Sequence, residues 1–248
     1  MRELATGTET VVAGGPGESV TEPQWRPDGT LTFLSDRSGW WNPYRWTPGG
    51  SVEVLVAVEA EVGVPGWQLG GSRYAVLDQE EHADGGRLVF ARSSRGFDAL
   101  AVREPDGTVS ELDVPFSVIR SVRADGPGAV LCVAGSPTVE PGVHRVVLGP
   151  HATRVETLRA PRELGVLDPA VLSVPEPMTF TSVDADGAPR TAHALFYPPG
   201  GAHSAPADEL PPLLTVLHGG PTGSAVPVLA LGVQYWTSRG FAVASRAE

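Results

Sequence analysis

A chain of 248 residues with 41% hydrophobic side chains is long enough to bury one large core or two smaller ones. Its formal net charge is −11, which argues against nucleic acid and anionic membranes as partners, because both require a basic surface. No apolar run approaches the ~20 residues that a membrane-spanning helix needs, and the first residues carry no apolar signal region. We therefore expect a cytoplasmic protein that binds neither nucleic acid nor membrane.

Residues 1–158 are predicted to form short strands separated by tight turns. Pro27-Asp28-Gly29 predicts a turn, and the alternating residues 31–35 predict the strand after it. This plan recurs in units of roughly 40–50 residues with four strands each, which is typical of β-propeller blades. A β-sandwich is the alternative, but it predicts no recurring plan. About three units are present, whereas a closed ring has about 4–8 blades, so we expect a partial β-propeller.

The pattern changes after residues 159–175, a segment with three prolines that we interpret as a connector. Residues 176–248 are predicted to form a second domain. Its alternating strands at 178–183 and 191–197 precede a continuously apolar strand at 213–217. Such a strand is typical of a parallel sheet in which both faces are buried.

A helix is predicted next, between Ser224 and Gly240. Ser224 can cap its start, Pro227 suits its first turn, and Gly240 suits its end. Its apolar side chains recur at helical spacing: Val226, Leu229, Ala230, Val233 and Trp236. Another strand begins at 241–244, so the segment reads as the strand-helix-strand start of a doubly wound α/β sheet.

The motif with the clearest chemistry is His218-Gly219-Gly220-Pro221, directly after the apolar strand. Many α/β-hydrolases build half of an oxyanion hole from a strand that ends in this way. Glycines let the backbone turn tightly and present N–H groups to a developing oxyanion. We predict that Gly219 is the donor, with Gly220 second, and that His218 and Pro221 shape the loop. A plain tight turn is the alternative reading.

Several segments together resemble the prolyl oligopeptidase family of serine peptidases, in particular its acylaminoacyl-peptidase and dipeptidyl-aminopeptidase branch. The similar segments are residues 23–29, 35–42, 61–67, 173–177, 217–223 and 234–243. The resemblance implies a β-propeller followed by an α/β-hydrolase domain, with the active site between them and short peptides as substrates. It also implies a Ser nucleophile, a His base and an orienting Asp, acting through an acyl-enzyme.

The sequence departs from that family in its catalytic residues. It contains no Gly-x-Ser-x-Gly, and none of Ser72, Ser136 and Ser224 has glycines at that spacing. All six histidines lie at or before His218, whereas the catalytic His of the family lies after the nucleophile. We therefore expect a chain truncated at both ends, with only the N-terminal part of an α/β-hydrolase fold. We expect it to be inactive as a peptidase by itself.

Two acidic segments are candidate binding sites. Glu59 and Glu61 alternate before Trp67, and propeller carboxylates of exopeptidases in the family can hold the free amine of a substrate. A solvated acidic loop is the alternative reading. The run at 80–84 contains three acidic residues and a histidine, but it lacks recognisable ligand spacing, so we predict no metal site and no cofactor.

Other classes of function remain to be weighed. Cys132, the only cysteine, lies in an apolar strand and is predicted to be a buried structural thiol rather than a nucleophile. A non-catalytic propeller that binds a partner would account for residues 1–158, but not for the strand-helix-strand unit. An esterase of the α/β-hydrolase type would use the same His-Gly-Gly turn.

Overall fold

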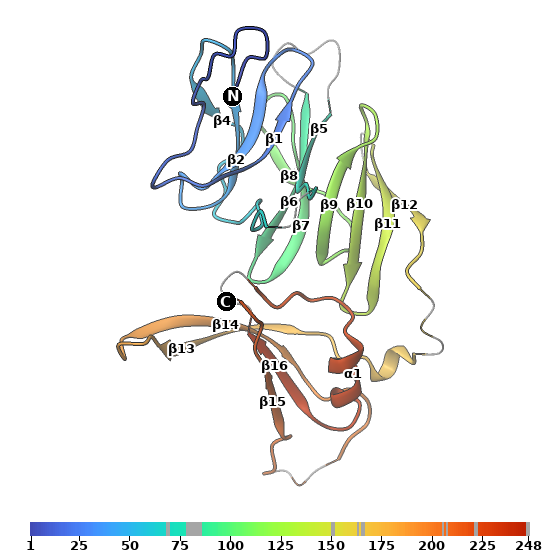
Figure 1. Cartoon of the computed structure of the whole chain (residues 1–248). Helices are drawn as coiled ribbons and strands as arrows, with labels where there is room; N and C mark the ends of the chain where they lie inside the picture. Colours follow the sequence, from blue (N-terminus) through green and yellow to red (C-terminus); the bar gives the residue numbers. More distant parts are fainter. Residues whose placement is uncertain are drawn as a thin grey trace.

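A computed structural model describes residues 1–67, 70–77, 86–149, 152–162, 164, 167–204, 206, 208–220 and 223–246 (Figure 1). Within these residues, the strands form four sheets of four strands each. The helices among them are the 3-10 helix η1 (Pro169–Val171) and the α-helix α1 (Leu231–Thr237). Neither is long and apolar enough to cross a membrane.

The first three sheets repeat one plan, in which each strand pairs antiparallel with the next strand along the chain. We call them blades 1, 2 and 3. Blade 1 consists of β1 (Val20–Trp25), β2 (Leu31–Ser35), β3 (Asn42–Trp46) and β4 (Val52–Val54). Blade 2 consists of β5 (Tyr74–Leu77), β6 (Arg87–Ser94), β7 (Phe97–Arg103) and β8 (Val109–Glu111). Blade 3 consists of β9 (Val118–Ala124), β10 (Ala129–Ser136), β11 (Val139–Leu148) and β12 (Thr153–Arg159). The predicted four-strand units are confirmed.

Blade 2 lies between the other two blades and buries both of its faces. Successive side chains along a strand point to opposite faces. Tyr74 and Phe90 therefore pack with Leu34 of blade 1, whereas Val89 packs with Val130 of blade 3. The core of the first three sheets is thus made of sheet faces stacked on one another, as in a propeller.

The fourth sheet has a different plan, with the strand order β13-β14-β16-β15. β13 (Glu176–Val183) and β14 (Pro189–Tyr197) form an antiparallel hairpin that extends away from the rest of the molecule (Figure 1). β14 also pairs antiparallel with β16 (Ala242–Arg246), and β16 pairs parallel with β15 (Leu213–Val216). Because α1 joins β15 to β16, the predicted strand-helix-strand order is present.

The predicted burial of the strand at 213–217 is wrong. The side chains of Leu213 and Val216 are 56% and 47% exposed. The reason is the place of β15 in the sheet: it is the last strand, so among the described residues only β16 flanks it. An apolar run therefore predicted the strand and its parallel pairing, but not its edge position.

The predicted start of the helix is also wrong. α1 begins at Leu231, whereas capping and spacing place the start near Ser224. The intervening residues are not helical, because the carbonyl oxygen of Pro227 and the N–H of Leu229 form hydrogen bonds with blade 3. The predicted end is confirmed, since Gly240 follows the helix with a φ of +85°, a conformation that favours glycine.

The division of the chain into domains stays a prediction. β12 ends at Arg159, and β13 begins at Glu176. These ends agree with the connector at 159–175, but where one independently folded unit stops is not tested by the position of strands.

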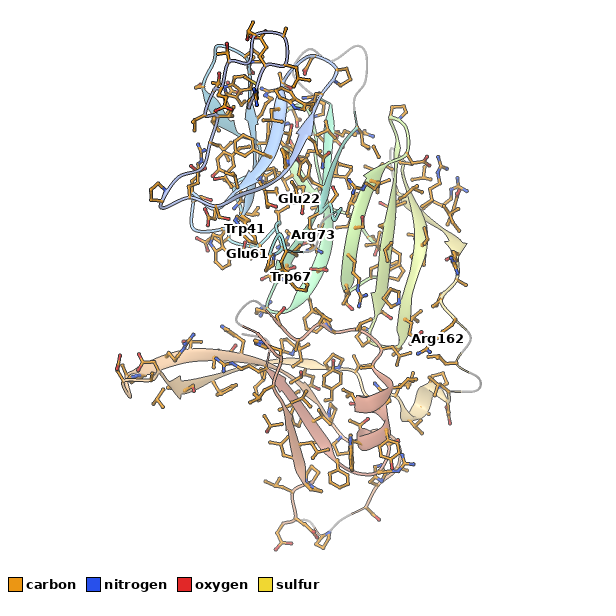
Figure 2. All side chains as sticks on the ribbon, viewed as in Figure 1. Glu22, Trp41, Glu61, Trp67, Arg73 and Arg162 are labelled. Carbon is orange, nitrogen blue, oxygen red and sulfur yellow. The ribbon has the colours of Figure 1, made fainter. Side chains whose placement is uncertain are left out.

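A buried arginine joins the three blades. The Arg73 guanidinium pairs with both oxygens of Asp98 at 2.9 and 3.0 Å, and the two side chains are only 4% and 11% exposed. Arg73 also donates to the carbonyl groups of Val62 and Ile119, while its backbone N–H donates to a carboxylate oxygen of Glu22. Burial raises the pKa of Glu22, although this N–H and the charge of Arg73 oppose the rise. Figure 2 shows Glu22 and Arg73 close to each other within the blade region.

Replacement of Arg73 should destabilise the protein strongly. Arg73→Met leaves Asp98 buried without its counter-charge, and breaking a buried pair in this way typically costs about 3–5 kcal/mol. We expect a large fall in the urea midpoint of unfolding. Arg162→Met is the matched control, since Arg162 pairs with Glu140 at the surface and is 65% exposed. Equal midpoints for the two variants would contradict the prediction.

Cys132 should be inert in the folded protein. It lies in β10 and is 2% exposed, so the prediction of a buried thiol is confirmed. Burial raises the pKa of the thiol to about 12, and the thiolate is the reactive form. We expect no reaction with a disulfide reagent at pH 8 until urea unfolds the chain. Rapid modification of the folded chain would show that β10 opens.

Candidate functional site

The His-Gly-Gly turn follows β15 directly, at the carboxyl end of a strand that runs parallel to β16. Gly219 and Gly220 are exposed, His218 is half-buried, and Gly220 has a φ of +74°. Among the described residues, the N–H groups of these two glycines have no acceptor. Pro221, which was predicted to shape the loop, lies outside the described residues.

Gly223 closes the turn on itself. A Cβ at this position would lie 2.6 Å from the Gly219 carbonyl oxygen and 2.8 Å from Nδ1 of His218. Both distances are shorter than any real contact of a Cβ atom, so the turn requires glycine at Gly223. The backbone of Gly223 therefore lies directly against the candidate donor Gly219.

A hollow of about 230 Å³ lies between the propeller blades and the fourth sheet. Its lining includes the predicted carboxylates Glu59 and Glu61, together with Ser224, Ala225 and Val226. These last three residues come just after the His-Gly-Gly turn. The structure therefore brings the predicted carboxylates to the residues that follow the turn, some 160 positions later in the chain, whereas Gly219 and Gly220 are not among the residues that line the hollow.

Glu61 is held firmly within this hollow. Its backbone pairs with Ser93 of β6 through two hydrogen bonds of 2.7 and 3.2 Å, and its Oε2 accepts a hydrogen bond from the backbone N–H of Trp41 at 2.8 Å. Trp41 in turn packs on Gly63, where a Cβ would lie 2.6 Å from the indole ring. Figure 2 shows Glu61 and Trp41 close together beside blade 1. Glu59, two residues earlier, is exposed.

Two side chains that line the hollow, an arginine and a histidine, were not predicted as site residues from the sequence. Arg95 lies at the tip of the β6–β7 hairpin with a φ of +51°, which is uncommon for a residue other than glycine. His193 of β14 reaches the hollow from the fourth sheet, and its Nδ1 lies 3.0 Å from Oγ1 of Thr179. The turn at 93–96 could be read from sequence, but its place beside Glu61 could not.

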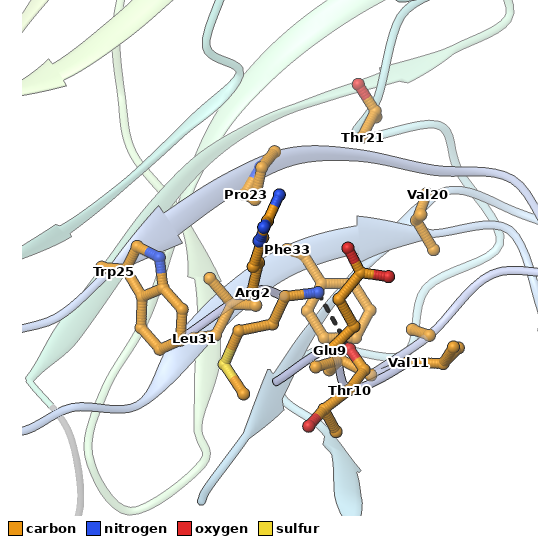
Figure 3. A pocket seen from close by; sticks show the side chains of 13 residues that line it. Arg2, Glu9, Thr10, Val11, Val20, Thr21, Pro23, Trp25, Leu31 and Phe33 are labelled. Atoms are coloured by element: carbon orange, nitrogen blue, oxygen red, sulfur yellow. Dashed lines mark hydrogen bonds between the residues drawn. The ribbon is translucent and has the colours of Figure 1, made fainter. Parts of the chain in front are cut away.

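A second hollow, of about 710 Å³, lies on blade 1 away from the fourth sheet (Figure 3). Trp25, Leu31 and Phe33 form much of its wall, and the N-terminal segment closes one side through a bond from the Met1 ammonium to the Thr10 carbonyl. It is the larger hollow, but it contains none of the predicted site residues. We therefore place the candidate site at the smaller hollow.

No group of three or more metal-binding side chains occurs among the residues that the structure describes. The acidic segment at 80–84 lies outside them. The polar groups of the hollow include the Glu59 and Glu61 carboxylates, Arg95 and His193, and the main-chain N–H groups of the glycine turn precede its Ser224 wall. Carboxylates can accept from an amine, and main-chain N–H groups can donate to a carbonyl oxygen.

Comparison with known proteins identifies relatives among solved structures. No family model and no curated protein matches the sequence. A puromycin-hydrolyzing peptidase of Mycobacterium tuberculosis matches with 36% identity and a TM-score of 0.81, over 95% of this chain and 35% of that one. A puromycin hydrolase matches with 33% identity and a TM-score of 0.78, over 96% of this chain and 34% of that one.

A more distant match shares the fold alone. A prolyl endopeptidase structure has 13% identity and a TM-score of 0.64, over 95% of this chain and 32% of the other. In every case the chain spans about a third of the length of the relative. The blades and the fourth sheet therefore match about a third of each of these longer chains. Over the third of their length that it spans, the chain is homologous to the peptidases of the prolyl oligopeptidase family.

Proposed function

We propose that the chain is part of a serine peptidase of the prolyl oligopeptidase family that hydrolyses short peptides through an acyl-enzyme. Its contribution is the substrate-binding hollow and one half of the oxyanion hole. The observation that carries this proposal is the hollow itself, in which Glu59 and Glu61 meet the segment that follows the His-Gly-Gly turn. A homologue at 36% identity is described as a peptidase that hydrolyses puromycin.

The fourth sheet supports an α/β-hydrolase assignment for residues 176–248. β15 and β16 are parallel neighbours joined by α1, which is the unit that such folds repeat. Ligands of these folds bind beyond the carboxyl ends of the strands. The His-Gly-Gly turn lies at that end of β15, and Figure 1 shows β16 ending beside the propeller blades. We therefore assign residues 176–248 to the beginning of a hydrolase domain.

The turn would act on the reacting carbonyl group. Attack by a serine converts the carbonyl oxygen to an oxyanion, and the N–H of Gly219 would donate to it. Gly220 is the second candidate donor. One such donor typically contributes about 10²–10³ in rate. Within residues 1–248 no serine stands at Gly-x-Ser-x-Gly spacing. We therefore assign the nucleophilic serine, its histidine base and the aspartate to other segments of the peptidase.

The carboxylates would bind the amino terminus of the substrate. An ammonium group in the hollow can pair with Glu61, which the Trp41 N–H orients, and with Glu59 beside it. This arrangement would favour substrates with a free amine next to the scissile bond. An esterase of small acyl esters has no need for two carboxylates at this place, so the amine distinguishes the two functions.

Binding of a free amine tests this assignment. Puromycin, which the related hydrolases act on, has a free α-amino group and can be titrated into the full chain by calorimetry, with N-acetylpuromycin as the blocked analogue. We expect only puromycin to bind, and we expect Glu61→Gln to weaken its binding about tenfold, the typical worth of a charged hydrogen bond.

The control variant is Glu53→Gln, which removes an acidic side chain of β4 outside the hollow and should leave binding unchanged. Equal binding of puromycin and its acetylated analogue, or equal effects of the two variants, would argue against an amine site.

Covalent labelling tests where the nucleophile lies. A fluorophosphonate modifies activated serines, and none of the serines in residues 1–248 is in a nucleophile motif. We expect no labelling of the 248-residue chain under conditions that label an intact serine peptidase completely. Stoichiometric labelling at Ser224, or at any other serine of the chain, would mean that the nucleophile has been misplaced.

A further inference from the structure

The segment at 224–229 connects the His-Gly-Gly turn to α1, and it is not helical. Its own sequence favours a helix, because Ser224 can cap one, Pro227 suits a first turn, and the apolar spacing continues without a break into α1. A segment that is non-helical against its local preference must be held by contacts elsewhere.

Blade 3 and Ser117, the residue directly before it, supply two of these contacts. The hydroxyl of Ser117 donates to the Pro227 carbonyl oxygen at 2.9 Å, and the N–H of Leu229 donates to the Ser136 carbonyl oxygen, also at 2.9 Å. Leu229 is 7% exposed. An α-helix that began near Ser224 would use the same carbonyl and N–H groups for its internal bonds, so the two arrangements exclude each other.

Ser117 is itself fixed within the propeller blades. Its N–H donates to Gly135 of β10 at 3.0 Å, and its carbonyl oxygen accepts the N–H of Asp98 at 2.9 Å. Asp98 is the partner of the buried Arg73. The hydroxyl that holds Pro227 is therefore attached to the hydrogen-bond network that contains the buried Arg73–Asp98 pair.

Blade 2 and the segment pack on the same apolar cluster of the fourth sheet. Phe97, the first residue of β7, packs against the apolar cluster of Leu195, Tyr197 and Val243 in the fourth sheet, as does Ala225 of the segment. The Ala225 N–H also donates to the carbonyl oxygen of Arg246 at 3.2 Å. The segment is therefore bonded to the end of β16 and shares an apolar cluster with Phe97 of blade 2.

The conformation of residues 224–229 directly affects the His-Gly-Gly turn. Ser224 follows Gly223, and the backbone of Gly223 lies against the carbonyl oxygen of Gly219 and the ring of His218, with no room for a single added methyl group. If residues 224–229 became helical, Gly223 would move with them, and the contact with Gly219 would change.

We infer that Ser117 and Phe97 are positioning residues for the His-Gly-Gly turn. Ser117 holds residues 224–229 non-helical through Pro227, and Phe97 does so through the apolar cluster on which Ala225 also packs. This conformation sets the direction in which the Gly219 and Gly220 N–H groups point. The propeller blades thereby decide the geometry of a turn that belongs to the fourth sheet. That this turn receives an oxyanion rests on the proposed function; that the blades set its geometry does not.

Nuclear magnetic resonance of the isotope-labelled full chain tests the inference. In Ser117→Ala we expect the Cα shifts of residues 226–230 to move toward helical values and the Gly219 and Gly220 amide signals to shift. We also expect exchange of the Leu229 amide to accelerate about fivefold, the typical worth of one neutral hydrogen bond. Ser117→Thr keeps the hydroxyl and should restore the native spectrum.

The matched control is Ser110→Ala, at an exposed serine of β8, which should change none of these signals. Phe97→Ala should produce the same changes as Ser117→Ala, and if it does not fold, the Ser117 variants decide. Unchanged Gly219 and Gly220 signals in folded Ser117→Ala would overturn the inference, whether or not the Leu229 amide exchanges faster. Because the readout is backbone conformation, it is independent of puromycin binding.

Discussion

One buried guanidinium group, that of Arg73, needs hydrogen-bond acceptors, and this need links the three blades. Arginine keeps its charge at any ordinary pH, and its five N–H donors must all find acceptors when water is excluded. At Arg73 these acceptors come from different blades: Asp98 from blade 2 and the Ile119 carbonyl group from blade 3. Blade 1 supplies the Glu22 carboxylate, which accepts the Arg73 backbone N–H. The pair therefore does more than offset a buried charge, since it sets how three sheets stand relative to one another.

Two consequences for the candidate site follow from that arrangement. Ser93 and Asp98 flank the β6–β7 hairpin, so the tip that carries Arg95 and Phe97 is placed by the same network. Glu61 pairs with Ser93 along the backbone, which positions its carboxylate at the mouth of the hollow. The acidic side of the hollow is thus built by the blades, whereas the His-Gly-Gly turn is built by the fourth sheet.

Local sequence predicted which turns and strands form better than it predicted which residues lie beside them. Turn residues such as Pro27-Asp28-Gly29 act through backbone conformations that need no distant partner, and Gly29 indeed has a φ of +81°. The strand at 213–217 illustrates the opposite case. Apolar residues and period indicate that a strand forms, but burial depends on which neighbours lie beside it, and β15 is an edge strand with exposed Leu213. Residues 224–229 show tertiary contacts overriding helix signals altogether.

By itself, the sequence determined the recurrence of four-strand units, the order of strand, helix and strand after residue 213, and the glycine turn at the end of β15. These features depend on alternation, helical spacing and the conformational freedom of glycine, which act over a few neighbouring residues. Only the tertiary structure decided that Glu59 and Glu61 face the residues after that turn, that Arg95 and His193 join them, and that α1 starts at Leu231. Each of these depends on hydrogen bonds and packing between segments far apart in the chain, where blade 3 competes with a local helix for the same backbone groups.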